Sequence, residues 1–308
     1  MGVLNVTPDS FHDGGVHGFD GIRSETDRSE TDRAGTDRSD TARADTDRAV
    51  RAGLAMFAAG ADIVDVGGES TRPGAAEVPA AVERARVLDV VRELAPYGRV
   101  SVDTRKAEVA RAAVAAGASI VNDVSGSLGP LAGELGVGYV AMHMRGTPRT
   151  MQQAPRYVDV VAEVAQFLHA IAEEALRAGA PTVWIDPGFG FGKTLAHNVA
   201  LFRAIPRLAA SGFPVLVGVS RKTMVGQLTG RESTERRLPG SLAAVCAAAQ
   251  LGADVVRVHD VPETVDAVRV ARALLPAAVP GALDAATDPI APPVAGVAGA
   301  RARAGAAR

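Results

Sequence analysis

The chain has 308 residues, of which 47% are hydrophobic, with a single cysteine and a formal net charge of −2. This charge argues against a nucleic-acid partner held by bulk electrostatics, and one cysteine excludes a disulfide framework and favours a reducing compartment. No apolar run approaches the ~20 residues of a membrane span, and no basic leader precedes an apolar segment. We therefore expect a cytoplasmic protein with neither a membrane nor a nucleic acid as its partner.

Eight short apolar runs, each leading into a polar cluster, alternate with helix-like stretches along the chain. Polar residues in or directly after these runs are Asn5, Asp65, Asp103, Asn122, Asp123, His143, Asp186, Ser220, Arg221, Lys222, Arg257 and His259. The helical stretches are 46–59, 78–94, 106–116, 157–178, 195–210, 234–250 and 262–275, and several end at glycine, the usual helix stop. Such alternation implies parallel strands joined by right-handed crossovers. We predict an α/β fold, a single (β/α)8 TIM barrel over residues 1–275, with its site at the C-terminal ends of the strands.

Three features stand apart from the barrel pattern. Residues 24–48 repeat a five-residue unit five times, each copy ending in arginine. A period of five buries no face of a helix or strand, so we expect a solvated, disordered insert after the first strand; a charged docking loop is the alternative. Residues 276–308, rich in Ala, Pro and Gly, are expected to be a disordered tail. Met1 falls directly on the first strand, and we expect the true start to lie upstream, which the intact mass of the native protein would test.

The first strand runs into the loop NVTPDSFHDGG, which carries one amide and two carboxylate side chains. Asn5 offers an amide, and Asp9 and Asp13 offer carboxylates. Such ligands suit Mg²⁺, which is usually held by few protein groups together with substrate phosphates. The alternative is an ordinary turn punctuated by Asp and Pro.

Two further loops carry candidate binding residues. In GGESTRPGA, Thr71 and Arg72 lie between glycines, and an arginine there can clamp a phosphate or carboxylate, unless it is only an exposed turn residue. The loop DPGFGFGKT is not a phosphate-binding P-loop, because Pro187 stands where the first glycine is required. Its Phe189 and Phe191 instead predict an aromatic wall beside a flat ligand, with core packing as the alternative.

Residues at the ends of the inner strands predict two neighbouring pockets. Asp103, Asn122 and Asp186 end three strands and, with Lys222, could read the edge of a flat, guanidine-like heterocycle. Any one of them alone could simply cap a helix. Arg257 and His259 lie on one side of the last strand, where this fold often binds phosphate, and predict an anion pocket. His12 and His143 are interpreted as supportive or incidental.

The motifs NVTPDSF, DVGGESTRPG, SVDT, NDVSG, MHMRGTP, DPGFGFGK, GVSRK and RVHDV, in this order, resemble the bacterial dihydropteroate synthases. The resemblance covers residues 1–260 outside the repeat. It implies a pterin-binding transferase of folate biosynthesis, which joins p-aminobenzoate to hydroxymethyl-dihydropterin pyrophosphate. It further implies Mg²⁺ as cofactor, a homodimer and a target of sulfonamides.

Matching motifs imply a role for each candidate residue. The pterin would be bound by Asp103, Asn122, Asp186 and Lys222, and the pyrophosphate by Asn5, Arg257 and His259, with Asn5 and Asp9 near Mg²⁺. p-Aminobenzoate would be surrounded by Thr71, Arg72, Pro73, Phe191, Ser220 and Lys222, and Asp13 would help to close the first loop. Val124 is a further substrate-binding candidate, and the catalytic set is Asp9, Asp13, Arg72, Lys222, Arg257 and His259.

Two other functions compete with this one. A pterin-binding methyltransferase domain would share the barrel and the pterin pocket but would not need the TPDSF and STRPG loops. A non-catalytic paralogue would bind pterin without synthase activity, and the departure that favours it is His12 in SFHDGG, where the family usually has SFSDGG. Because the repeat directly follows this loop, we expect it to slow turnover without abolishing it.

Overall fold

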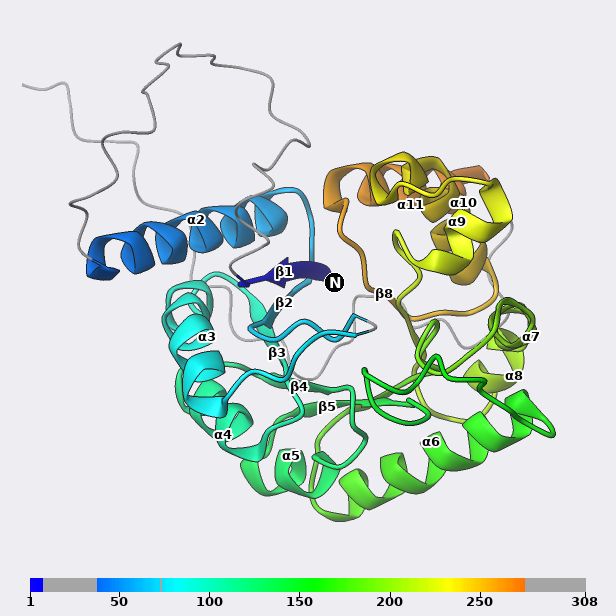
Figure 1. The fold of residues 1–308 in the computed structure, drawn as a ribbon, viewed down its shortest axis with the longest axis horizontal. Helices are drawn as coiled ribbons and strands as arrows, with labels where there is room; N and C mark the ends of the chain where they lie inside the picture. The colour runs from blue at the N-terminus through cyan, green and yellow to red at the C-terminus, as the bar shows by residue number, and fades with distance from the viewer. Residues whose placement is uncertain (8–37, 73, 275–308) are drawn as a thin grey trace, which may run out of the picture.

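Eight parallel strands form the centre of the molecule, and helices surround them (Figure 1). The structure, a computed structural model, describes residues 1–7, 38–72 and 74–274, with only the backbone for 38–42. The strands are β1 Gly2–Asn5, β2 Ile63–Gly67, β3 Arg99–Asp103, β4 Ile120–Asp123, β5 Gly138–Met142, β6 Val183–Asp186, β7 Leu216–Val217 and β8 Val255–Val256.

The strands close into a barrel. β1 to β6 pair in chain order in one sheet, and β7 pairs with β8. Two isolated bridges join these parts, between Ile185 and Val215 on one side and between Gly2 and Val258 on the other. Across the second join, the backbone N–H of Val3 donates to the oxygen of Val258 at 2.9 Å. The predicted eight-stranded barrel is therefore confirmed.

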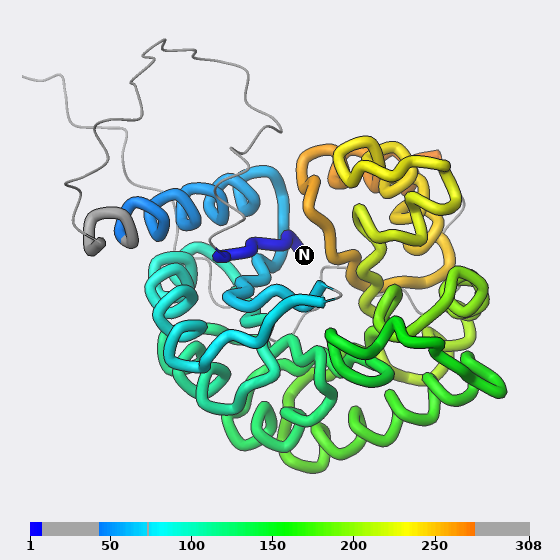
Figure 2. The backbone as a smooth tube through the Cα atoms, viewed as in Figure 1, coloured from blue at the N-terminus to red at the C-terminus, as the bar shows by residue number. Residues whose placement is uncertain are grey.

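The helices form the outer ring, and the tube in Figure 2 shows how each strand leads outward to a helix and back. Two consecutive strands can pair in parallel only if such a crossover returns the chain to the same end of the barrel. The helices are α2 Arg38–Ala58, α3 Ala80–Leu94, α4 Ala107–Ala115, α5 Gly129–Leu135, α6 Val160–Arg177, α7 Leu195–Arg203, α8 Ile205–Ala209, α9 Thr223–Thr229, α10 Leu238–Gln250 and α11 Val261–Leu274, with a 3₁₀ turn, η2, at Thr234–Arg237.

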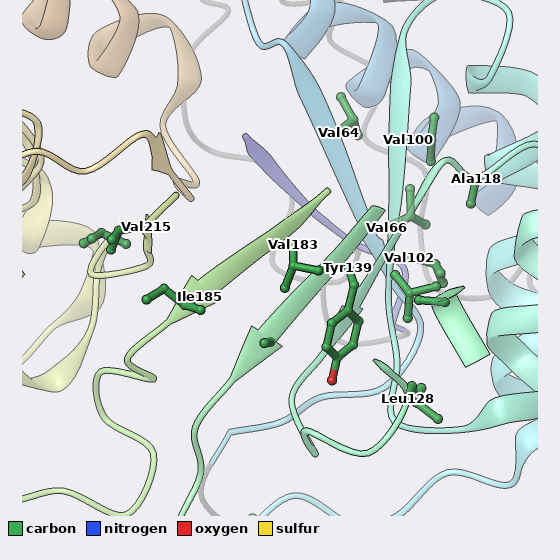
Figure 3. Close-up of a cluster of buried hydrophobic side chains, with 14 of the residues drawn as sticks. Val64, Val66, Val100, Val102, Ala118, Leu128, Tyr139, Val183, Ile185 and Val215 are labelled. Atoms are coloured by element: carbon green, nitrogen blue, oxygen red, sulfur yellow. The ribbon is translucent and has the colours of Figure 1, made fainter. Parts of the chain in front are cut away.

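Alternation along the strands divides their side chains between two environments. One set packs beneath the helices in the main core; it includes Val64, Val66, Val100, Val102 and Ile185 (Figure 3). The other set contains a separate apolar cluster, formed by Met1, Ile63, Ile120, Val140, Trp184 and Leu216. Asp65, Asn122, Asp186 and Arg257 each lie two residues nearer the C-terminal end of their strands than a residue of this cluster or one packed on it, respectively Ile63, Ile120, Trp184 and Val255. The cluster therefore forms a floor, and the polar side chains face the mouth of the barrel.

Part of the predicted insert is helical. Helix α2 begins at Arg38, so residues 38–48 are helical and the prediction of disorder there is wrong. Ala49 is fully buried against the barrel, whereas Arg43, Asp47 and Arg48 are exposed. Packing at the buried end stabilises the helix. Extending an existing helix by further turns is easier than starting a new one, so the helix continues even without an apolar stripe. Residues 24–37 and the tail from 276 onward lie outside the described residues.

Two other differences concern the C-terminal half. The helix predicted over 195–210 is divided into α7 and α8 at Ala204, two residues before Pro206. Proline lacks the N–H that would continue the helical ladder. Helix α9 was not predicted, because its seven residues are too few to show a clear period. No helix within the described ranges is long and apolar enough to cross a membrane.

Candidate active site

An arginine at the end of the last strand joins two buried carboxylates across the barrel. Arg257 donates from Nε to Oδ2 of Asp65 at 2.7 Å and from Nη2 to Oδ2 of Asp103 at 2.8 Å. Asn122 donates from Nδ2 to the same oxygen of Asp65 at 2.9 Å. β2, β3 and β8 are not all neighbours in the sheet, so these contacts cross its interior. The four side chains form one polar cluster at the barrel mouth.

The protonation of this cluster is balanced by burial and charge. Burial raises the pKa of Asp103 to about 7, against the lowering effect of Arg257, while the Asp65 carboxylate adds to the rise. Burial acts to lower the pKa of Arg257, but the two carboxylates outweigh it and hold that pKa above its usual range. Oδ1 of Asp65 and Oδ1 of Asp103 are buried and have no hydrogen-bond partner among the described residues. These two oxygens are therefore acceptors for the N–H groups of a ligand.

A second cation lies beside the carboxylate that ends β6. Asp186 accepts the backbone N–H of Gly188 through Oδ1 at 2.8 Å. Lys222 donates from Nζ to the Phe189 backbone oxygen at 2.6 Å and lies 4.7 Å from the centroid of the Phe191 ring. Burial lowers the pKa of Lys222 to about 8, opposed by the charge of Asp186. Burial also raises the pKa of Asp186, opposed by Lys222. The two charges therefore stabilise each other, and both side chains can contact a polar heterocycle.

A neutral histidine lies among several arginines where β7 and β8 end. Nδ1 of His259 and Oγ of Ser220 are 3.2 Å apart, and this oxygen also accepts the backbone N–H of His259 at 3.2 Å. Ser220 therefore holds the His259 ring in place through Nδ1, and Nε2 is the ring nitrogen that this contact leaves for a ligand. Burial lowers the pKa of His259 to about 3, and the charges of Arg257, Arg221 and Arg72 add to this effect. The same positive charges favour an anion.

The second loop carries Arg72, whose charge acts on His259. Arg72 is exposed and Thr71 is half-buried. The backbone N–H of Gly74 donates to the Pro148 oxygen at 3.1 Å, so the loop contacts the segment after β5. Pro73 lies outside the described residues. Arg72 is therefore placed to contact a ligand without being fixed by the core.

The proposed magnesium ligands are only partly within the described structure. Asn5 is half-buried at the end of β1, paired in register with Gly67, and Asp9 and Asp13 lie outside the described residues. In the described part of the chain, no three His, Cys, Asp or Glu side chains form a group suited to a metal. A single amide oxygen at the mouth fits a magnesium ion that a pyrophosphate brings with it, because such an ion needs few protein ligands.

Two predicted residues lie in the apolar interior. Phe189 is fully buried and packs against Phe202 with ring centroids 6.0 Å apart, so it belongs to the core and its assignment to a ligand wall was wrong. Phe191, beneath Lys222, is the half-buried ring of this loop. Val124 is buried directly after β4, two residues beyond Asn122.

The residues that sequence reasoning left out of the site are Asp65 and Lys193. Asp65 lies two residues before Gly67 on β2, so both face the same side of the sheet, and Gly67 pairs with Asn5 and Asp103. This alternation is the sequence signal that would have identified Asp65 as a site residue. Lys193 is buried and donates to the backbone oxygens of Gly188 at 2.9 Å and Phe191 at 3.0 Å, and lies 2.9 Å from Nδ1 of His143. It therefore holds the aromatic loop against the segment after β5.

The His143–Lys193 contact predicts a pH-dependent stability. Burial, followed by the charge of Lys193, lowers the pKa of His143 to about 3. Below pH ~6.5 the unfolded chain binds a proton that the folded chain does not. The free energy of unfolding therefore decreases as the pH is lowered, by up to about 1.4 kcal/mol per pH unit for this one group. We expect His143→Asn, which keeps an acceptor for Lys193, to flatten denaturant-measured stability between pH 6.5 and 4. An unchanged slope would contradict this assignment.

Comparison with known proteins agrees with this geometry. Residues 31–259 match the family described as "Pterin binding enzyme". The dihydropteroate synthase of Escherichia coli is 45% identical over 285 residues, covering 90% of this chain and 92% of that protein. That of Mycobacterium leprae is 46% identical over 291 residues, covering 90% and 93%. The Xanthomonas albilineans dihydropteroate synthase solved with 4-aminobenzoic acid has a TM-score of 0.74 and 45% identity, covering 90% and 93%.

The barrel with carboxylates and an arginine at its mouth defines a pterin-binding enzyme of the transferase class. The family match and the sequence identities to curated relatives agree on a particular family within this class. The chain belongs to the dihydropteroate synthases. The resemblance drawn from eight ordered motifs is thereby confirmed.

Proposed function

We propose that the chain condenses hydroxymethyl-dihydropterin pyrophosphate with p-aminobenzoate, giving dihydropteroate and pyrophosphate for folate biosynthesis. The carrying observation is the cluster of Arg257 with Asp65 and Asp103, whose two buried oxygens lack partners among the described residues. Relatives support the same ligands, since the Xanthomonas albilineans enzyme has been solved with 4-aminobenzoic acid and with 7,8-dihydropteroate.

The pterin fits the inner part of the mouth. Its amino and ring N–H groups need acceptors, which Asp103 and Asp186 supply as carboxylates. Asn122 has one amide hydrogen bond to Asp65 and offers its carbonyl oxygen to the ligand. Lys222, with its pKa lowered to about 8 chiefly by burial, donates to a ring nitrogen or carbonyl. Val124 provides an apolar wall.

The pyrophosphate and the aromatic acid occupy the outer part. Nη1 of Arg257 and Nε2 of His259 would serve as donors for the leaving group, and Asn5 would join them. Mg²⁺ bound at Asn5 and Asp9 would supply further charge neutralisation for the pyrophosphate. p-Aminobenzoate would lie against Phe191 and Lys222, bordered by Ser220 and by Thr71, Arg72 and Pro73.

The chemistry then depends mainly on charge and on exclusion of water. Arg257 and His259 stabilise charge as the carbon–oxygen bond to pyrophosphate breaks. The carboxylates Asp103 and Asp186 stabilise the electron-poor pterin methylene that results. The aromatic amine is already neutral at pH 7, so it can attack this carbon without a strong general base. The second loop, and Asp13 in the first, would keep water from competing with the amine.

The decisive experiment measures pyrophosphate release from the pterin substrate with Mg²⁺, with and without p-aminobenzoate. We expect release that depends on p-aminobenzoate, with one dihydropteroate formed for each pyrophosphate. Pterin binding without turnover would instead support the non-catalytic paralogue, and methyl transfer to a corrinoid would support the methyltransferase alternative. The proposed homodimer is checked in the same preparation by its mass in solution.

A further inference from the structure

The base of the second loop is closed by a glutamate. The loop leaves β2 after Gly67 and returns at α3, and Glu69 lies at its start with its side chain 6% exposed. Oε1 of Glu69 accepts the backbone N–H of Val78 at 3.0 Å, which joins two points nine residues apart. Everything between them, including Thr71 and Arg72, therefore projects from a base that this carboxylate holds together.

A lysine from the next strand–helix connection fixes that glutamate. Nζ of Lys106 donates to Oε2 of Glu69 at 2.6 Å and to Oε2 of Glu83, on α3, at 2.5 Å. Arg105 adds two longer contacts to Glu69, at 3.3 Å and 3.2 Å, and an ion pair with Glu77 at 3.1 Å. Lys106 is therefore the shared point at which the loop base, helix α3 and the end of β3 meet.

The charge balance makes this lysine difficult to replace. Glu83 is fully buried, and its Oε1 has no hydrogen-bond partner within the described ranges, so Lys106 is the cation that compensates its charge. Burial alone would lower the pKa of Lys106, but hydrogen bonds to Glu69 and Glu83 outweigh it and raise that pKa. Burial opposes ionisation of Glu69, but hydrogen bonds from Arg105 and Lys106 hold its pKa below the ordinary range. Lys106 and Glu69 are thus both charged at neutral pH.

The position of this group connects it to the reaction. β3 ends at Asp103, three residues before Lys106, so the same short segment carries a pterin-binding carboxylate and the anchor of the second loop. We propose that Lys106 is a positioning residue, which through Glu69 and Glu83 holds the second loop at the angle that brings Thr71 and Arg72 over p-aminobenzoate. This inference rests on the proposed function, and a loose loop would admit water to the pterin methylene.

The first test uses the full chain and two readouts. In Lys106→Met we expect the KM for p-aminobenzoate to rise about ten-fold with kcat within about two-fold, since misplacement of a binding group weakens its ligand. We also expect more than one pyrophosphate released for each dihydropteroate formed, while the Kd of the pterin substrate stays unchanged. Lys106→Arg, which keeps the charge, should restore most of the coupling.

Matched variants separate positioning from folding. Lys106→Met leaves the buried Glu83 without its cation, so the double variant Lys106→Met/Glu83→Gln removes that charge and preserves the fold. Arg111→Met on α4, which breaks an exposed ion pair with Glu134 of 2.8 Å, is the control and should change neither KM nor coupling. Unchanged KM and coupling in the folded double variant would overturn the proposal.

The second test needs no turnover. Hydrogen exchange at Val78 reports the bond to Glu69 directly, and we expect about ten-fold faster exchange there in the double variant, with α4 unaffected. If the native chain forms no dihydropteroate, the proposed function fails, but the exchange rate at Val78 still shows whether Lys106 holds the base of the loop. Equal exchange at Val78 in the native and double-variant chains would show that Lys106 does not hold the loop.

Discussion

Arg257→Leu is expected to slow synthesis about 10²–10³-fold and also to destabilise the fold. The arginine compensates two buried carboxylates, Asp65 and Asp103, and in the proposed reaction its Nη1 group would donate to the leaving group. Loss of one charge stabiliser of a transition state costs about 10²–10³ in rate. Removal of one partner of a buried ion pair costs about 3–5 kcal/mol in the free energy of unfolding. Steady-state rates and denaturant unfolding of the same preparation measure both effects.

A second substitution separates the two roles of this arginine. Asp65→Asn in the Arg257→Leu background removes one uncompensated charge, so we expect the free energy of unfolding to recover. The amide introduced by this substitution offers the leaving group no positive charge, so pyrophosphate release should not recover. Arg257→Lys keeps one charge without the planar fork and should give an intermediate rate. Recovery of synthesis in the double variant would show that Arg257 serves stability alone.

The C-terminal ends of the strands could be predicted from the sequence, because in each strand–helix unit an apolar run gives way to polar residues where the strand ends. Each apolar run must stop where the chain leaves the sheet, and Asp103 and Asp186 fall at those points. Asp65 escaped this reasoning because β2 continues two residues beyond it, to Gly67. Parity along the strand, rather than the end of the apolar run, decides that its side chain points inward.

Other features depend on contacts that no local pattern contains. Helix α2 extends through repeat units without an apolar stripe because its later turns pack on the barrel at Ala49. Lys193 has backbone oxygens among its partners, and these come together only when two loops are folded. The anchor at Lys106 joins residues 37 and 23 positions away, Glu69 and Glu83, and the sequence alone shows three ordinary surface charges.

Asp186→Asn is expected to weaken the pterin substrate strongly while leaving the fold intact. The introduced amide keeps an oxygen for the Gly188 N–H, which Asp186 now accepts at 2.8 Å, and the substitution removes a buried charge. The free energy of unfolding should therefore stay the same or rise. A carboxylate that accepts N–H groups contributes about 1.5–3 kcal/mol through each charge-assisted bond, so the Kd should rise roughly 10- to 100-fold. Calorimetric titration with the pterin substrate, beside thermal unfolding, measures both.

The same variant carries a pH signature through Lys222. Asp186 is the main charge that opposes the effect of burial on Lys222, whose pKa is lowered to about 8. Without that carboxylate the pKa of Lys222 falls further, so a smaller fraction of the lysine is protonated at any pH near neutrality. A neutral lysine donates weakly to the pterin and no longer contributes charge. We therefore expect the loss of affinity in Asp186→Asn, relative to the native chain, to be larger at pH 8 than at pH 6.5. A ratio of Kd values that is constant across this range would mean that Asp186 binds the pterin without setting the charge of Lys222.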